Sequence, residues 1–446
     1  MRQCLQQIVP GGLSVSHQRC PAVVHSGSRR PHSPASGVSA SGVVVALFIA
    51  SLPLTMLQWG SLGSVQRLVS VVLGACTLIV LYRKHTVLAF TMAARFWIAY
   101  TAWMLMAVCW TVTSVTASMT SALGVVLLTA VLVLMAQLPF NSHDYWLIRR
   151  SWTVMAIFAA AMFFAFGEQS RLGARTHLVL ESGGSDPNEF SAYLILPLAY
   201  FVESSITAGG TRRLLAAAST VGSIYIIVLT GSRAGVIAAL VVILIVSIRQ
   251  AGRGIRNLAI VGTVGAVCTL IVSEYVWPLV PESVRARLSI EALVQDRGSL
   301  RADIWKSGVD LVASSDFRFI VGFGPNGAPL DHHVMHNHFL QVLVDGGVIG
   351  LLLFLGIILT ALRASWCSVP IFAATVGVTI MMTTLTAYSN FRPAWAVLFM
   401  ALLISSVRKS HEGVSPKGSS PHRLHAEWTP VPHTQGFAEA DGRVSP

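Results

Sequence analysis

The fold is decided by residues 332–362, which read HHVMHNHFLQVLVDGGVIGLLLFLGIILTAL. The second half of this stretch is apolar over nearly the length that crosses a bilayer, because a hydrocarbon core of about 30 Å needs roughly 20 apolar residues in a helix. Four histidines stand before it: His332, His333, His336 and His338. The stretch therefore predicts a membrane helix with polar groups crowded near its beginning.

The rest of the chain has the composition of a membrane protein. Its mean hydropathy is +0.66, 54% of the residues are hydrophobic and only 11% are charged. Apolar stretches recur, and we predict about twelve transmembrane helices, which is an all-α, polytopic fold. The predicted spans are 41–57, 68–82, 96–113, 118–136, 152–166, 190–204, 214–229, 234–248, 258–272, 346–362, 368–388 and 393–407.

Basic residues orient these helices. With both termini in the cytoplasm, the five inner connections hold eleven basic residues and one acidic residue, Asp144. The long outer loop, residues 273–335, holds six basic and eight acidic residues. This asymmetry favours the chosen orientation, because lysine and arginine are retained on the cytoplasmic side. The formal charge of +12 then faces anionic lipid, so we expect a lipid bilayer and no nucleic acid as partner.

The sequence divides into one membrane domain and two tails. Residues 1–40 and 408–446 are rich in Ser, Pro and His, and we expect disordered cytoplasmic tails there. Residues 41–407 form the expected transmembrane domain. The six cysteines lie outside the predicted outer loops, so no disulfide framework is expected. No nucleotide-binding glycine motif is found, so no cofactor is expected.

Two short motifs lie on the predicted outer side. The sequence DPN at 186–188 precedes the span 190–204 and is typical of a capped helix start. The sequence TGSRAG at 230–235 joins two spans through a turn so short that the helices must nearly touch. Arg233 in this turn is either an anchor that reaches the lipid headgroups or a bidentate clamp on a phosphate group.

A third motif lies in the long outer loop. RADIWK at 301–306 begins a predicted amphipathic helix that packs on the membrane domain. GFGPNG at 322–327 follows, and its glycines are typical of an ordinary loop or of one whose backbone amides approach an anion.

The four histidines allow three interpretations. They could bind zinc, although one irregular segment would supply most of the ligands and no outer cysteine joins them. They could be solvated loop residues. A neutral imidazole could also act as a general base at the membrane surface, because only histidine has an unperturbed pKa near physiological pH.

Together the motifs resemble those of bacterial O-antigen ligases and polymerases. The resemblance rests on DPN, on GSRAG, on Arg301 and Trp305 with the GFGPNG that follows, and on HNHFLQ and DGGVIG within 336–350, in this order. It covers residues 180–400 of the chain and includes the helix count.

The resemblance implies an inverting, metal-independent membrane glycosyltransferase of the GT-C type. Such enzymes work at the outer, periplasmic face of the bacterial cytoplasmic membrane, where they move a glycan from undecaprenyl pyrophosphate to an acceptor hydroxyl. Arg233 and Arg301 match the arginines that hold the pyrophosphate, and His336 matches the histidine that positions or deprotonates the acceptor. We expect substrate binding by further motif residues: Asp186, Asn188, Ser232, Trp305 and Asn337. No role passes to His332, His333 or His338.

The acceptor stays open between two related activities. A ligase passes a finished polymer to a lipid core in lipopolysaccharide synthesis, whereas a polymerase joins repeat units of O-antigen or exopolysaccharide. The expected partners are the lipid-linked glycan donor, a glycan or lipid acceptor, and a flippase or chain-length regulator. The alternative function is a permease for polysaccharide or lipid-linked sugars, which the scarcity of charged residues in the middle of the predicted spans disfavours.

Overall fold

The computed structural model describes residues 37–57, 64–86, 88, 90–169, 176–180, 183–251, 274, 277–289, 301–330, 334–385 and 392–413. The long helices are α1 (Ala40–Ala50), α2 (Val65–Arg83), α3 (Met92–Met106), α4 (Val115–Met135), α5 (Ser142–Phe166), α6 (Pro187–Thr207), α7 (Gly210–Leu229), α8 (Arg233–Ala251), α14 (His338–Ser365), α15 (Val369–Met382) and α16 (Arg392–Gly413). Short helices are η1 (Leu52–Met56), η3 (Ala107–Trp110), η5 (Trp277–Leu279), α10 (Glu282–Leu288), α12 (Arg301–Ala313) and α13 (Asp316–Val321).

These helices confirm a helical, multi-pass membrane protein. Eight of the helices in the described ranges are long and apolar enough to cross a bilayer: α2, α3 with η3, α4, α5, α6, α7, α8 and α14. Helices α1 and α15 and residues 392–404 of α16 are apolar but shorter. The expected span 258–272 lies outside the described residues, so the count of about twelve stays a prediction.

One small sheet departs from the all-α expectation. Strands β1 (Gly167–Gln169), β2 (Thr176–Leu180) and β3 (Gly183–Ser185) form an antiparallel sheet in the order β1-β2-β3. The register pairs Gly167 with Leu178 and Leu178 with Ser185. The sheet leads from the end of α5 directly to the cap of α6, where the DPN motif lies.

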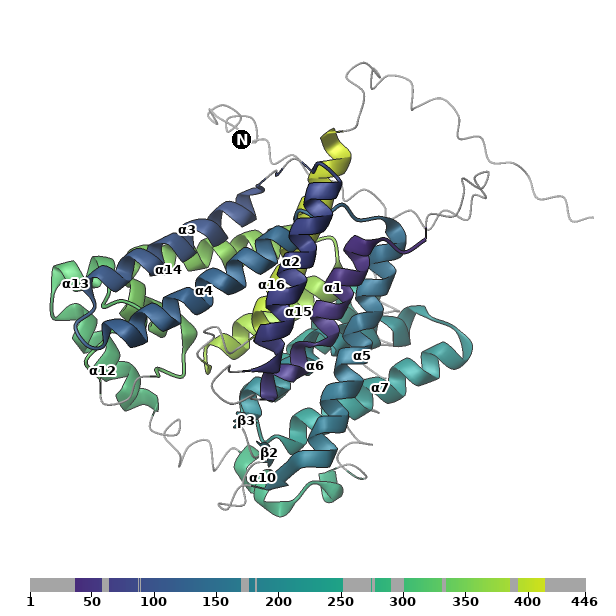
Figure 1. The fold of residues 1–446 in the computed structure, drawn as a ribbon. Coiled ribbons are helices and arrows are strands. Elements are labelled where there is room, and N and C mark those ends of the chain that lie inside the picture. Colours follow the sequence, from purple (N-terminus) through teal and green to yellow (C-terminus); the bar gives the residue numbers. More distant parts are fainter. Residues whose placement is uncertain are drawn as a thin grey trace, which may run out of the picture.

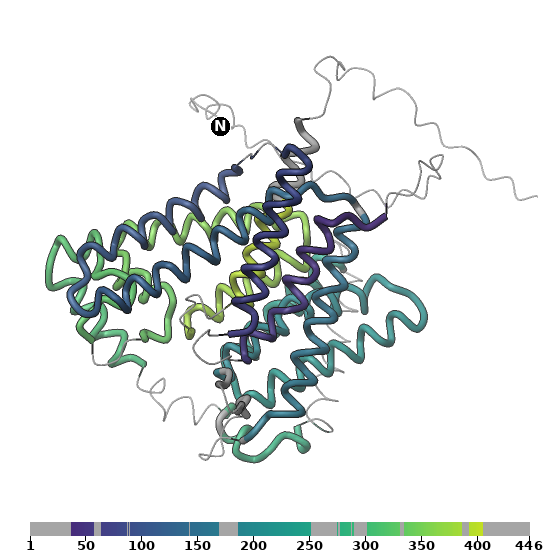
Figure 2. Tube along the Cα trace, viewed as in Figure 1, coloured from purple at the N-terminus to yellow at the C-terminus, as the bar shows by residue number. Residues whose placement is uncertain are grey.

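The helices form two groups that α16 joins (Figure 1). In the first group α14 packs on α3, which packs on α4, and α12 and α13 pack on α14. In the second group α6, α8 and α15 pack on one another and α7 packs on α6. Figure 2 shows that α1 begins, and α2 ends, at the upper end of the bundle, away from α10 and α12. We call the end at which α6, α8 and α16 begin the site end.

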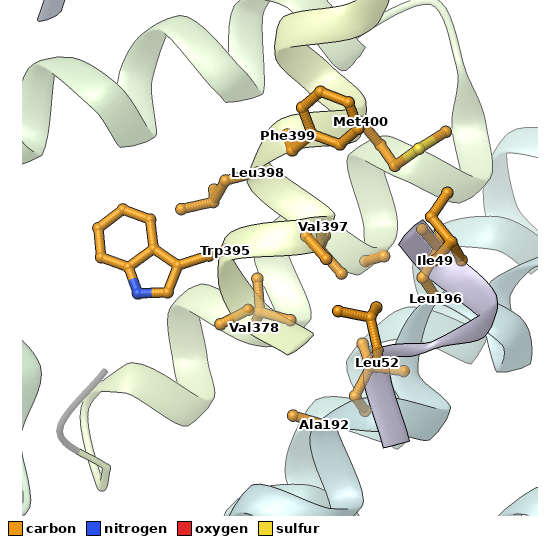
Figure 3. Packing of buried hydrophobic residues seen from close by; sticks show 14 of the residues in the cluster. Ile49, Leu52, Ala192, Leu196, Val378, Trp395, Val397, Leu398, Phe399 and Met400 are labelled. Carbon is orange, nitrogen blue, oxygen red and sulfur yellow. The ribbon is translucent and has the colours of Figure 1, made fainter. Parts of the chain in front are cut away.

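The first half of helix α16 is buried on all of its sides. Every residue from Ala394 to Leu403 is at most 2% exposed, as is typical of a helix in the middle of a bundle. Figure 3 shows its side chains pointing toward Ile49 and Leu52 on one side and Val378 on another. A helix held in this way fixes the position of its first residue, Arg392, relative to both groups.

Several boundaries differ from the sequence prediction. Helix α14 begins at His338, eight residues before the predicted span at 346, and continues through a kink at Gly347. Asp345, which the predicted span leaves just outside its start, is therefore buried inside α14. Helix α16 runs to Gly413 rather than to 407. The tail residues 1–36 and 414–446 lie outside the described residues.

The cysteines also differ from expectation at one position. Cys76 and Cys109 are free. Cys367, by contrast, is disulfide-bonded, and its partner is not among the described cysteines. The sequence predicted no disulfide framework, and Cys367 departs from that expectation.

Candidate functional site

The DPN and GSRAG motifs meet at the site end. Asp186 caps α6 by accepting hydrogen bonds from the backbone N and the Nδ2 of Asn188, both 2.8 Å long. The Ser232 hydroxyl donates to the Asn188 Oδ1 at 2.7 Å. Asn188 and Ser232 are buried, at 5% and 0% exposed. Because a buried polar group is costly unless it is hydrogen-bonded, this link holds the two helix starts in one arrangement.

Helix α6 contacts the turn between α7 and α8. Gly231 adopts a φ of +63°, which a residue with a side chain rarely does, so the chain can reverse within three residues. The Ser191 and Thr230 hydroxyls lie 3.0 Å apart. Ser232 Oγ accepts from the backbone N of Gly235 at 3.0 Å and so caps the first turn of α8.

Arg233 is the first residue of α8 and follows this buried network directly. Its side chain is half-buried, and it begins a helix whose first amide groups favour an anion. The guanidinium therefore extends from a rigid position and not from a loose loop. Such an arrangement can hold a phosphate group in a fixed geometry.

Helix α16 connects this region to the start of α14. Arg392, its first residue, is 7% exposed, and its charge acts on that of Glu189, the residue after Asn188. Arg67 at the start of α2 also acts on Arg392. One turn further along α16, the Trp395 ring lies 6.0 Å from the His338 ring. Charged residues of three helices therefore gather at the site end.

The histidine segment is fastened to α12. Trp305 Nε1 donates to the carbonyl of Met335 at 2.8 Å, and Met335 is 1% exposed. His336 follows with a φ of +48°, an uncommon left-handed conformation, and its side chain is half-buried. Asn337 caps α14, because its Oδ1 accepts from the backbone N of Phe339 and Leu340 at 3.0 and 3.2 Å. The backbone at His336 is thus fixed on both sides.

The GFGPNG loop packs backbone to backbone against α14. The backbone N of Phe323 donates to the Val344 carbonyl at 2.9 Å, and that of Gly324 to the Asp345 carbonyl at 2.8 Å. Gly322 and Gly347 have φ values of +77° and +63° and leave no room for a Cβ atom. The glycines of this motif therefore serve close packing at the kink of α14.

The described residues include no group of three or more His, Cys, Asp or Glu side chains that could hold a metal ion. His332 and His333 lie outside the described residues. His338 packs inside the bundle, where its ring lies 4.6 Å from that of Phe354. The histidines of the sequence motif therefore differ in surroundings, and His336 is the half-buried one near α12.

One part of the chain matches the model of a known family. The O-antigen ligase family model matches residues 218–355. No curated protein matches the chain. The matched region runs from within α7 to within α14, so it contains Arg233, Arg301 and His336 but neither Asp186 nor Arg392.

The structure brings some expected site residues together and gives them defined contacts. Asp186, Asn188 and Ser232 form one hydrogen-bonded chain. Trp305 and Asn337 hold the two sides of the His336 backbone. Arg301 is half-buried at the start of α12, one turn before Trp305. These contacts show that Asn188, Ser232, Trp305 and Asn337 hold neighbouring segments in place, and their contact with substrate stays a prediction.

Sequence reasoning missed three residues of this region. Glu189 of α6 and Arg392 of α16 act on each other electrostatically, and Asp345 is buried within α14. The sequence did contain a signal for Arg392. This arginine stands directly before Pro393 and an apolar helix, which is unusual among the outer residues. Nothing in the sequence indicated that Glu189 would face it.

The close approach of α6 and α8 predicts the effect of one added methyl group. In Gly235→Ala the new Cβ would lie 2.7 Å from the Cβ and Oγ of Ser191, so the two helices must separate. We expect a loss of about 1 to 3 kcal/mol of stability, measured as a lower thermal midpoint in detergent. Gly222→Ala in α7 is the matched control, because its Cβ meets nothing within 4 Å and alanine favours a helix. Equal midpoints for both variants would contradict the contact.

Proposed function

We propose that this protein is a glycosyltransferase of the bacterial cytoplasmic membrane. It moves a glycan from undecaprenyl pyrophosphate to an acceptor hydroxyl at the periplasmic face, in O-antigen ligation or in polymerisation of O-antigen or exopolysaccharide. The observation that carries the proposal is the buried Ser232–Asn188 link, which places Arg233 rigidly at the start of α8 within the matched ligase region. The family match supports membrane glycan transfer as the class of reaction.

The chemistry follows from the groups at hand. The bond between the anomeric carbon and the pyrophosphate oxygen breaks, and the acceptor oxygen forms a new bond to that carbon from the opposite face, which inverts it. Arg233 and Arg301 bind the pyrophosphate and stabilise the negative charge that grows on it as it leaves. His336 takes the proton of the acceptor hydroxyl. The reaction needs no metal ion, because the guanidiniums supply the electrostatic stabilisation.

The proposed orientation places the site end outside the cytoplasm. The residues 1–40 and 408–446 are then cytoplasmic tails, and residues 273–335, which include α10, α12 and α13, form a periplasmic loop over the site. The polyprenyl chain of the donor lies among the membrane helices, while the sugars lie under this loop. A flippase that delivers the donor, and a chain-length regulator, are the proposed partner proteins.

Deletion of the gene tests the function in the cell. We expect lipid-linked glycans to accumulate in the membrane, because their consumption stops. Accumulated single repeat units indicate a polymerase, and accumulated long chains that lack an attachment indicate a ligase. An unchanged pool of lipid-linked glycan would contradict the proposal, and donor retained only on the cytoplasmic face would indicate a permease.

A further inference from the structure

Asp345 is a buried carboxylate that the proposed reaction does not use. It lies in α14, just before the kink at Gly347, and its side chain is 0% exposed. A carboxylate at such a position is costly unless several donors face it. Two donors do so: the Nε2 of Gln341, 3.2 Å from each carboxylate oxygen, and the backbone N–H of Asn326.

Gln341 passes this contact on to the histidine segment. While its Nε2 donates to Asp345, its Oε1 accepts from the backbone N of Met335 at 2.9 Å. Gln341 is 2% exposed, so water does not compete for these bonds. Asp345 therefore determines the orientation of the Gln341 amide, because it needs the Nε2 donor and leaves the Oε1 acceptor for Met335. With the amide turned around, Nε2 and the Met335 N–H would be two donors facing each other.

Met335 is the residue that precedes His336. Its N–H, in the Val334–Met335 peptide, donates to Gln341 at 2.9 Å, and its carbonyl, in the Met335–His336 peptide, accepts from Trp305 of α12 at 2.8 Å. The next residue, His336, has the left-handed φ of +48°, which the surrounding contacts must maintain. A change in the backbone of Met335 therefore changes the direction of the His336 side chain.

We propose that Asp345 is a positioning residue, which acts through Gln341 to fix the backbone of Met335, the residue before His336, and so directs the imidazole toward the acceptor hydroxyl. The proposal rests on the role of His336 in the proposed function. The same carboxylate binds the Asn326 N–H of the GFGPNG loop, so it also joins that loop to the histidine segment. Packing alone does not require a carboxyl group here, since an amide or an apolar side chain fills a similar volume.

The direction of the hydrogen bonds gives a sharp test. In Asp345→Asn, residue 345 keeps one acceptor oxygen in place of two. When this oxygen accepts from the Asn326 N–H, the new Nδ2 faces the Gln341 Nε2, and two donors meet unless the Gln341 amide turns away from Met335. In Gln341→Glu, two carboxylates face each other. The double variant, Gln341→Glu with Asp345→Asn, again pairs each donor with an acceptor. The carboxylate at position 341 accepts from both the Met335 N–H and the new amide at position 345. The oxygen of that amide still accepts from Asn326.

The measurement compares these variants in a purified transfer assay with a lipid-linked glycan and an acceptor. We expect each single variant to lose about tenfold to a hundredfold in kcat with an unchanged KM for the donor, because the donor is held elsewhere. The double variant should recover to within about threefold of wild type. A rescue of this kind does not follow from loss of packing. Equal losses in the single and double variants, or full kcat in Asp345→Asn, would overturn the proposal.

A second variant keeps the test valid if Asp345→Asn does not accumulate in the membrane. Gln341→Met leaves Asp345 in place and removes only the amide bridge, and we again expect kcat to fall with an unchanged donor KM. Gln66→Met is the matched control, because Gln66 is 0% exposed and its amide makes no hydrogen bond with the described residues. Normal kcat in Gln341→Met would overturn the proposal. Absence of product from the wild-type protein would instead count against the proposed function itself.

Discussion

Replacing Arg233 by lysine is expected to lower glycan transfer about a hundredfold, although the positive charge is kept. The reason is geometric: a guanidinium forms two parallel hydrogen bonds to a phosphate group, whereas an ammonium acts as a single point charge. Loss of one fixed donor at a developing negative charge costs about a hundredfold or more in rate. The measurement is the rate of product formation by purified protein at saturating acceptor.

The matched control for this variant is Arg150→Lys. Arg150 stacks over the Trp146 ring at 3.5 Å near the beginning of α5, far from the site end, and its replacement should leave transfer unchanged. Wild-type activity in Arg233→Lys, at a normal amount of folded protein, would remove the pyrophosphate clamp from the mechanism. Equal impairment of both arginine variants would indicate a general effect on the membrane domain.

Replacing His336 by asparagine is expected to abolish most of the transfer while the fold stays intact. Asparagine tolerates the left-handed backbone that His336 adopts, so the variant removes the imidazole with little added strain. Loss of a general base lowers the rate by a factor of about 10² to 10⁴. We expect the thermal midpoint to stay near that of wild type, and the lipid-linked donor to accumulate in cells that carry the variant.

His85→Asn is the control with the same backbone conformation. His85 has a φ of +46° and lies exposed after α2, at the end of the bundle away from the site. Its replacement should change neither transfer nor stability. If His336→Asn keeps its transfer rate, His336 does not act on the acceptor, and the half-buried imidazole serves only the local structure.

The helices could be predicted from the sequence because hydropathy and helix caps are local signals. Residues 187–207 illustrate this, since DPN predicts the start of α6 and the apolar run that follows predicts its length. The start of α14 could not be predicted in this way. Asp345 and its two glycines interrupt the apolar run, and the helix includes them because the GFGPNG loop packs on this point, where the backbone N of Gly324 donates to the Asp345 carbonyl.

The site was predictable in part for the same reason. The motifs identified Arg233, Arg301 and His336 as candidates through a resemblance, but no pattern along the chain indicated how the motifs contact each other. The bond between Ser232 and Asn188 joins residues 44 positions apart, and Arg392 reaches Glu189 from the far end of the chain. Such contacts depend on how α6, α8 and α16 pack, which a single sequence does not encode locally.

The most direct test of the central claim is a transfer assay with purified protein, an undecaprenyl-pyrophosphate-linked glycan and a hydroxyl acceptor. We expect one glycosylated acceptor and one free undecaprenyl pyrophosphate for each donor consumed, with an inverted anomeric centre and undiminished activity in the presence of a chelator. Folded protein that leaves the donor intact with every acceptor tested, or that needs a divalent metal for transfer, would contradict it.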